Sequence, residues 1–365
     1  MHTMLACRSD FSLGESIFSA EALIEAAKTH GQKAVAMTDT MSVAGLVNFS
    51  KEAKKAGIKA IIGARLRISE NAAWRPDKTL GEKKKHMPKS FFLTYYARSE
   101  TGLKALYRLL TLANEEPRFY YNAKLDWSDV RDILVTLTAA DYAIVLGDEQ
   151  ALHQHKLFGA ILADVMHHKL SAYLPIVLVD TPYYGRINQL SIEYGTMMDI
   201  PLLAIRPALY EAGGADCQEI LTAVVENTKA TDGFFRSRFN RDMHPMALPD
   251  FIGEAKKVIG HLSRRGVQNA AVHVQAAIRA TAPFVETVTY EWSKAAPSLP
   301  KLADDEFKAV VAECQKGFIE RFKTPMFGHL PSKIEQLQVY LPRLKYELGV
   351  LEKLGFSPYF LTVQD

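Results

Sequence analysis

The first part of the chain alternates between short apolar runs and amphipathic segments, in the order strand, helix, strand, helix, strand. Helices that join successive strands in this way are typical of a parallel sheet or barrel covered by helices. Ser19 is placed as an N-cap of the first helix, and Gly57 is placed to end the second. The pattern predicts an α/β fold with strands at Met4–Arg8, Ala34–Thr38 and Ile58–Ile62 and helices at Ala20–Lys28 and Val43–Ala56.

The functional side chains of such folds lie where the strands end, at their carboxyl termini. Three segments of this chain occupy that place, namely Arg8–Asp10, Thr38–Thr40 and Gly63–Arg65. We therefore expect these segments to lie close together and to form the site.

The composition limits the classes of protein that need to be considered. Of the 365 residues, 48% are hydrophobic and 23% are charged, as in ordinary soluble proteins, and the length favours two domains. The formal charge of +3 is too small to indicate nucleic-acid binding, and no apolar run is long enough to span a membrane. Three widely spaced cysteines fit a reducing compartment, so we expect a cytoplasmic protein without disulfides.

Several short segments resemble one known family. Arg8–Ser12 is similar to the turn H-[ST]-x-[YF]-S, Ala36–Asp39 to A-[IM]-T-D, and Gly57–Gly63 to G-I-K-P-I-x-G. These motifs occur in this order in the PHP domain (polymerase and histidinol phosphatase) that opens the alpha subunit of bacterial DNA polymerase III. The resemblance implies a PHP-type distorted TIM-like (β/α)7 barrel over residues 1–240.

The family's metal-binding pattern is largely absent from this sequence. The resemblance implies a site in which histidines and carboxylates from several strand ends hold divalent metals. The corresponding positions are here Ala6 and Arg8 for H-x-H, Asp39 and Thr40 for the end of T-D-H, Arg65 for a carboxylate, and Pro207 and Leu209 for D-x-H. One carboxylate remains and two positions are cationic, so we expect no metal, no other cofactor and no catalytic residue in this chain.

Two roles are open for Asp39. It could form an ion pair with Arg8 or Arg65 in the emptied site, or it could cap a helix that begins near Met41. Cys7 lies next to Ala6 within an expected strand, and we interpret it as a small buried side chain rather than as a replacement ligand.

Residues 241–365 form the second expected domain, a linker followed by a mostly helical segment. Arg343–Leu361 resembles the helical segment that leads into the polymerase palm. The carboxylates of Asp304–Glu306 are expected to begin a helix, where acidic side chains favour the positive end of the helix dipole. The palm aspartates of the family would follow Asp365, so Mg²⁺ is expected only in a full polymerase.

The resemblance implies the N-terminal part of a replicative DNA polymerase III alpha-like subunit. This part would be a scaffold that docks a proofreading exonuclease or another replisome protein and meets DNA through the rest of the polymerase. One alternative is a stand-alone, phage-borne PHP-derived module that acts on a host replisome. A further alternative, a metal-dependent phosphoesterase, conflicts with the lost ligands. Whether the chain is a fragment or a natural short product is left open by the sequence, and the reading frame beyond Asp365 would distinguish the two.

Overall fold

The computed structural model describes residues 3–75, 88–147, 156–225, 242–293, 299–322 and 333–364. The chain divides into two compact units, Met1–Trp292 and Ser293–Asp365. The predicted domain boundary at residue 240 lies outside the described residues. Two helices that follow it pack into the core of the first unit, so the division in the structure falls later than the sequence suggested.

A single sheet of nine strands forms the centre of the first unit. Its order is β8-β7-β6-β4-β3-β2-β1-β9, and β5 pairs separately with β3. The strands are β1 (Met4–Cys7), β2 (Ala34–Thr40), β3 (Lys59–Ser69), β4 (Ser90–Ala97), β5 (Leu125–Asp126), β6 (Tyr142–Val145), β7 (Ala172–Val177), β8 (Leu202–Ile205) and β9 (Pro207–Ala208).

The sheet is mixed and nearly closes into a barrel. Neighbouring strands are parallel except at β4, which runs antiparallel to both β3 and β6. Strands β8 and β9 are separated by Arg206 alone, and they pair with opposite edges of the sheet, β8 with β7 and β9 with β1. This arrangement confirms the predicted α/β barrel class.

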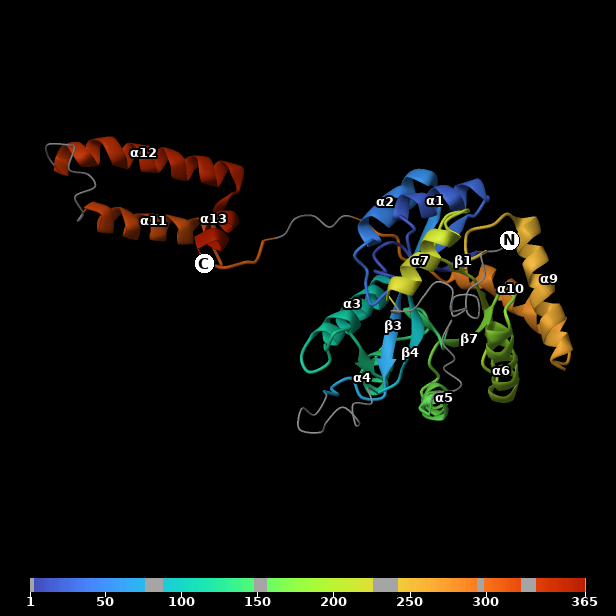
Figure 1. Cartoon of the computed structure of the whole chain (residues 1–365). Coiled ribbons are helices and arrows are strands. Elements are labelled where there is room, and N and C mark those ends of the chain that lie inside the picture. The colour runs from blue at the N-terminus through green and yellow to red at the C-terminus, as the bar shows by residue number, and fades with distance from the viewer. Residues whose placement is uncertain are drawn as a thin grey trace. The chain divides into compact units, whose positions relative to one another are not determined.

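Helices surround the strands of this unit (Figure 1). Within its described residues, the helices are α1 (Ala20–Thr29), α2 (Leu46–Ala56), α3 (Glu100–Asn114), α4 (Trp127–Leu134), α5 (Phe158–His167), α6 (Pro182–Met198), α7 (Ala215–Val225), α9 (Leu248–Arg264) and α10 (Ala270–Glu286). Their buried side chains, together with those of the strands, form three clusters of apolar side chains.

The expected start of the first helix and the expected end of the second are confirmed by their caps, whereas α2 begins at Leu46 and not at Val43 as expected. The Ser19 hydroxyl accepts the backbone N–H of Ala22 at 3.1 Å, which is the contact of an N-cap. Gly57 ends α2 with φ of 66°, a left-handed conformation that glycine adopts without a Cβ penalty. Ser19 therefore marks the start of α1, and Gly57 marks the end of α2.

The second unit contains α11 (Glu306–Phe322), α12 (Lys333–Leu354) and α13 (Ser357–Gln364). Asp305 accepts the backbone N–H of Lys308 at 3.0 Å, so this carboxylate begins a helix as predicted. Among the described helices of both units, none combines the length and the apolar composition needed to cross a bilayer.

Candidate functional site

The positions that the sequence assigned to the lost metal site lie close together on four neighbouring strands. The expected strand end at Ile62 is wrong, because β3 continues to Ser69, and Arg65 lies within β3 beside the end of β2. Strands β9, β1, β2 and β3 are adjacent, with Ala6 opposite Pro207 and Thr40 opposite Arg65. The backbone N–H of Arg8 donates to the carbonyl of Ala208 at 3.1 Å. The seven predicted positions, Ala6, Arg8, Asp39, Thr40, Arg65, Pro207 and Leu209, are therefore brought together as expected.

Asp39 is fully buried and accepts three hydrogen bonds from the turn that follows β1. Its Oδ1 accepts the Ser9 backbone N–H at 2.6 Å and the Ser12 hydroxyl at 2.7 Å, and its Oδ2 accepts the Ser9 hydroxyl at 2.7 Å. The predicted capping role of Asp39 is wrong, because α2 begins only at Leu46, too far along the chain for Asp39 to cap it. The three hydrogen bonds come from serines, and Arg8 acts on Asp39 through its charge. The predicted ion pair of Asp39 with Arg8 or Arg65 stays a prediction.

The serine contacts matter because Asp39 is removed from water. Burial raises the pKa of the Asp39 carboxyl above its ordinary value of 3.8, while the hydrogen bonds from Ser9 and Ser12 and the charge of Arg8 oppose that shift. The folded protein consequently holds the Asp39 proton more tightly than the unfolded chain does.

Glu15 forms ion pairs with both Arg8 and Arg65. Its Oε2 lies 3.1 Å from Arg65 Nη1 and 3.7 Å from Arg8 Nε, and it accepts the Thr40 hydroxyl at 2.6 Å. The side chains of Arg8 and Arg65 are 4% and 5% exposed, whereas that of Glu15 is 28% exposed. Glu15, which is partly exposed to solvent, thus pairs with two guanidinium groups that are buried.

Sequence reasoning missed Glu15, which lies in the irregular segment between β1 and α1. One signal was available, because cations predicted at strand ends require a nearby carboxylate. The loop holds Glu15 in place through the main chain as well, since Gln218 of α7 donates its side-chain amide to the Glu15 carbonyl at 3.0 Å.

Arg65 has a second contact that fixes its orientation. Its guanidinium carbon lies 3.5 Å from the centre of the Phe92 ring, and that of Arg67 lies 4.9 Å from the same ring. Phe92 belongs to β4, the antiparallel neighbour of β3. A cation over an aromatic face gains electrostatic attraction, so the barrel wall itself supports the charge that Arg65 brings.

We call Arg8, Glu15, Asp39 and Arg65 the plug. It contains two cations and two carboxylates, so its formal charges cancel. Among the described residues, no group of three or more His, Cys, Asp or Glu side chains is arranged to hold a metal ion. The donors of the plug do not suit the metal that the family resemblance implies, because two of its four ionisable groups repel a cation.

Cys7 lies beneath the plug, in β1. It is fully buried within the largest apolar cluster, and burial raises the pKa of its thiol far above the ordinary value. A thiol of this kind is not a thiolate at neutral pH and does not act as a nucleophile or metal ligand. The interpretation of Cys7 as a small core side chain is confirmed.

Comparison with known proteins gives one family match and many relatives. A family model described as PHP domain matches residues 5–164. Over 99% of its length, the chain is 29% identical to a DNA polymerase III subunit alpha of Yersinia pestis and 26% identical to that of Aquifex aeolicus. The chain covers 31% and 30% of those two relatives, so it spans about a third of their length.

Among solved structures, a putative metal-dependent phosphoesterase from Bifidobacterium adolescentis aligns with 56% of this chain and 86% of its own length. The identity is 11% and the TM-score is 0.34, a likeness too slight to carry an argument.

Proposed function

The chain carries a PHP domain and is related to the N-terminal region of bacterial DNA polymerase III alpha subunits, and on this premise we propose that it serves as a non-catalytic scaffold within a DNA polymerase assembly. The scaffold acts in the cytoplasm, where the replisome assembles. DNA-templated synthesis belongs to the complete polymerase, with Mg²⁺ held by palm carboxylates that this sequence does not contain.

The plug is the observation that carries this proposal. A metal-dependent phosphoesterase needs ligands that attract a divalent ion and an open position for water or substrate. The corresponding strand ends here present the guanidinium groups of Arg8 and Arg65, tied together by Glu15. Replacing metal ions by arginines retains positive charge between the strand ends while removing the Lewis acid, which favours a role in structure over one in hydrolysis.

The partner we propose is a proofreading exonuclease subunit. A polymerase whose own PHP site lacks metal ligands must obtain proofreading from another protein, and a rigid barrel beside the polymerase is a suitable support for it. The resemblance to replicative alpha subunits supports this partner over one outside replication.

The first experiment measures metal content and hydrolysis. Protein purified without chelators and then incubated with Zn²⁺ or Mn²⁺ is expected to retain no stoichiometric metal in elemental analysis and to hydrolyse no phosphoesters. Asp39→Asn is the matched variant, since it changes the remaining carboxylate at the former metal positions. Two or more tightly bound ions per chain, whose removal abolishes a phosphatase activity that Asp39→Asn also lacks, would contradict the proposal.

The second experiment tests the partner. The full 365-residue chain is mixed with the proofreading exonuclease subunit of the same source and passed over a size-exclusion column. We expect a one-to-one complex whose exonuclease remains active. If the two proteins elute separately at tens of micromolar, while other replisome subunits are retained by the chain, the exonuclease is the wrong partner and the alternative of a separate interaction module is favoured.

A further inference from the structure

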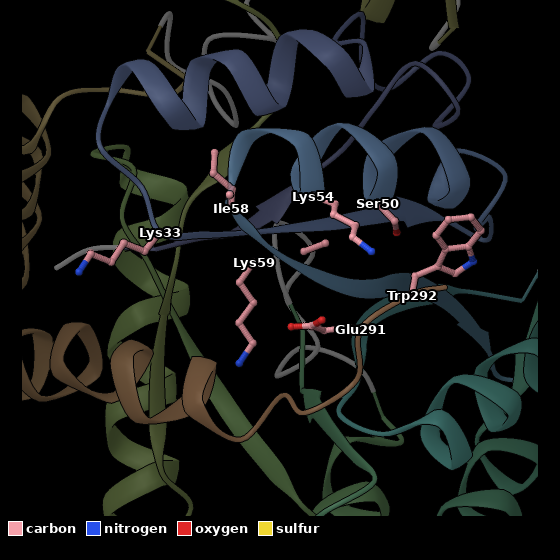
Figure 2. Close-up of a pocket in the computed structure, with 9 residues that line it drawn as sticks. Lys33, Ser50, Lys54, Ile58, Lys59, Glu291 and Trp292 are labelled. Atoms are coloured by element: carbon pink, nitrogen blue, oxygen red, sulfur yellow. The ribbon is translucent and has the colours of Figure 1, made fainter. Parts of the chain in front are cut away.

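A cavity of about 420 Å³ lies at the opposite end of the barrel from the plug. It is found at the amino ends of β2 and β3, where the chain also returns after α10 (Figure 2). Its walls are formed by Lys33, Ser50, Lys54, Gly57, Ile58, Lys59, Ala60, Glu291 and Trp292. The strands that separate the two ends are seven and eleven residues long, so the cavity is not part of the former metal site.

Positive charge dominates the cavity. Three lysines line it against one carboxylate, that of Glu291. The ammonium group of Lys59 donates a hydrogen bond to the carbonyl of Val285 at 2.8 Å, and this neutral acceptor leaves the charge of Lys59 uncompensated. Among the residues that the structure describes, no carboxylate lies within ion-pair distance of Lys33, Lys54 or Lys59. In Figure 2, Lys54 extends toward the side where Ser50 and Trp292 lie, Lys59 extends beside Glu291, and Lys33 extends away from the others. The cavity therefore carries a net positive charge that attracts an anion.

Ser50 provides an independent sign of a missing partner. This residue of α2 is 6% exposed, and its hydroxyl oxygen is buried without a hydrogen-bond partner in the structure. A buried hydroxyl that makes no hydrogen bond is unfavourable, and native proteins satisfy nearly all such groups. Ser50 precedes Lys54 by four residues, so the two side chains share one face of α2. An acceptor placed beside Lys54 would be in reach of both.

Trp292 gives the cavity an aromatic wall. The indole is partly buried against the main apolar cluster, which holds the ring in position. Aromatic side chains next to cationic ones are typical of sites for nucleic-acid components, because a base stacks on the ring while ammonium groups bind the phosphate. The volume is within the range of small-ligand pockets.

We propose that this cavity binds a nucleoside phosphate, with the phosphate at Lys54, Lys59 and Ser50 and the base against Trp292. Glu291 is placed to accept an N–H from the base, so that it assists rather than repels the ligand. The proposal concerns residues outside the plug and does not depend on the partner proposed above.

The test uses the full chain and three probes, namely deoxyadenosine monophosphate, deoxyadenosine and inorganic phosphate. Isothermal titration calorimetry is expected to show one saturable site for the monophosphate and at least tenfold weaker binding of the other two, because each lacks one of the two contacts. Lys54→Met and Lys59→Met should each raise the dissociation constant of the monophosphate about tenfold, since each removes a charged hydrogen bond.

Lys55→Met is the matched control. Lys55 neighbours Lys54 on α2 but pairs with Glu52 at 2.6 Å and does not line the cavity. This variant removes the same charge from the protein and should leave the dissociation constant unchanged.

Two further variants, Ser50→Ala and Trp292→Phe, test whether these residues bind the ligand or only stabilise the fold. Without ligand, Ser50→Ala should unfold at the same or a higher temperature, because it removes an unsatisfied hydroxyl, whereas the rise in unfolding temperature that the monophosphate causes should shrink. Trp292→Phe should abolish the change in tryptophan fluorescence on binding, since Trp74 and Trp127 lie outside the cavity.

Three outcomes would overturn the proposal. The first is the absence of saturable monophosphate binding, including the case in which a single-stranded oligonucleotide binds and the monophosphate does not. The second is binding that Lys54→Met and Lys55→Met weaken equally, which would indicate general charge attraction. The third is inorganic phosphate binding as tightly as the monophosphate, which would remove the role of Trp292.

Discussion

The two ends of the barrel treat charge in opposite ways. At the carboxyl end, the guanidinium groups of Arg8 and Arg65 are buried and share the carboxylate of Glu15. At the amino end, Lys54 and Lys59 lie around a cavity without a carboxylate partner among the described residues. Burial decides the difference, because a cation removed from water needs a partner, whereas a cation in contact with water does not. The plug is therefore expected to stabilise the fold, and the cavity is expected to leave charge available for a ligand.

Glu15→Gln should have the largest effect on stability. It leaves two buried guanidinium groups without the carboxylate that joins them, and the loss of one partner from a buried ion pair costs about 3 kcal/mol. The free energy of unfolding in urea measures this change. Glu25→Gln is the control, since Glu25 pairs with Lys28 on the surface with both side chains more than half exposed, and it should cost well under about 1 kcal/mol. Equal losses in the two variants would show that the plug is open to water.

A double-mutant cycle between Glu15 and Arg65 measures how much of the stability of the plug comes from this one ion pair. The two side chains approach to 3.1 Å, so Glu15→Gln and Arg65→Met should couple by about 2 kcal/mol. The cycle between Asp39 and Arg65 serves as the comparison, because the hydrogen bonds of Asp39 come from Ser9 and Ser12. Stronger coupling of Arg65 to Asp39 than to Glu15 would contradict this expectation and support the ion pair with Asp39 that the sequence predicted.

Asp39→Asn should change the dependence of stability on pH. The folded-state pKa of Asp39 lies above 3.8, so its ionisation makes the unfolding free energy fall as pH rises from 3.8 to the folded-state value. Asparagine keeps the oxygen that accepts from Ser9 and Ser12 and does not ionise. At pH 7 the variant should be within about 1 kcal/mol of the native protein. Urea unfolding between pH 3 and pH 7 should show that the unfolding free energy of the variant falls less with rising pH than that of the native protein. Identical pH profiles of the two proteins would refute the raised pKa of Asp39.

Lys54→Gln should have the smallest effect of the four changes. Without ligand, its free energy of unfolding should lie within about 0.5 kcal/mol of the native value, because the Lys54 side chain is exposed. Arg8→Gln, at the other end of the barrel, is the counterpart and should be clearly destabilising. A large loss in Lys54→Gln would mean that the lysines of the cavity are structural.

The sequence predicted the carboxyl end of the barrel well because its residues follow regular strands. Apolar runs at Met4–Arg8, Ala34–Thr38 and Ile58–Ile62 are visible from periodicity, and the pairing of adjacent parallel strands then brings Arg8, Asp39 and Arg65 close together. The partners of these residues were less predictable. Ser9, Ser12 and Glu15 lie in a turn without periodicity, so their side-chain directions depend on the fold around them.

The amino end was not predicted at all. Trp292 and Glu291 reach the cavity only because α9 and α10 continue the first unit beyond the expected boundary at residue 240. The position of the chain after α10 depends on packing against residues more than two hundred positions earlier in the sequence. No local sequence pattern predicts such a contact. The unsatisfied Ser50 hydroxyl is likewise visible only once its surroundings are known.

The junction of β8 and β9 through Arg206 has a consequence for how the protein is made. This short run pairs with both edges of the sheet, so the barrel cannot close until the ribosome has synthesised the run. At about 5–20 residues per second, roughly 10–40 s pass between the emergence of β1 and that of β9. During this interval β1 offers an unpaired edge to other chains, as exposed edge strands do. The risk of misassembly during translation is thus set by the arrival of one seven-residue run, Leu202–Ala208, and not by the stability of the finished barrel.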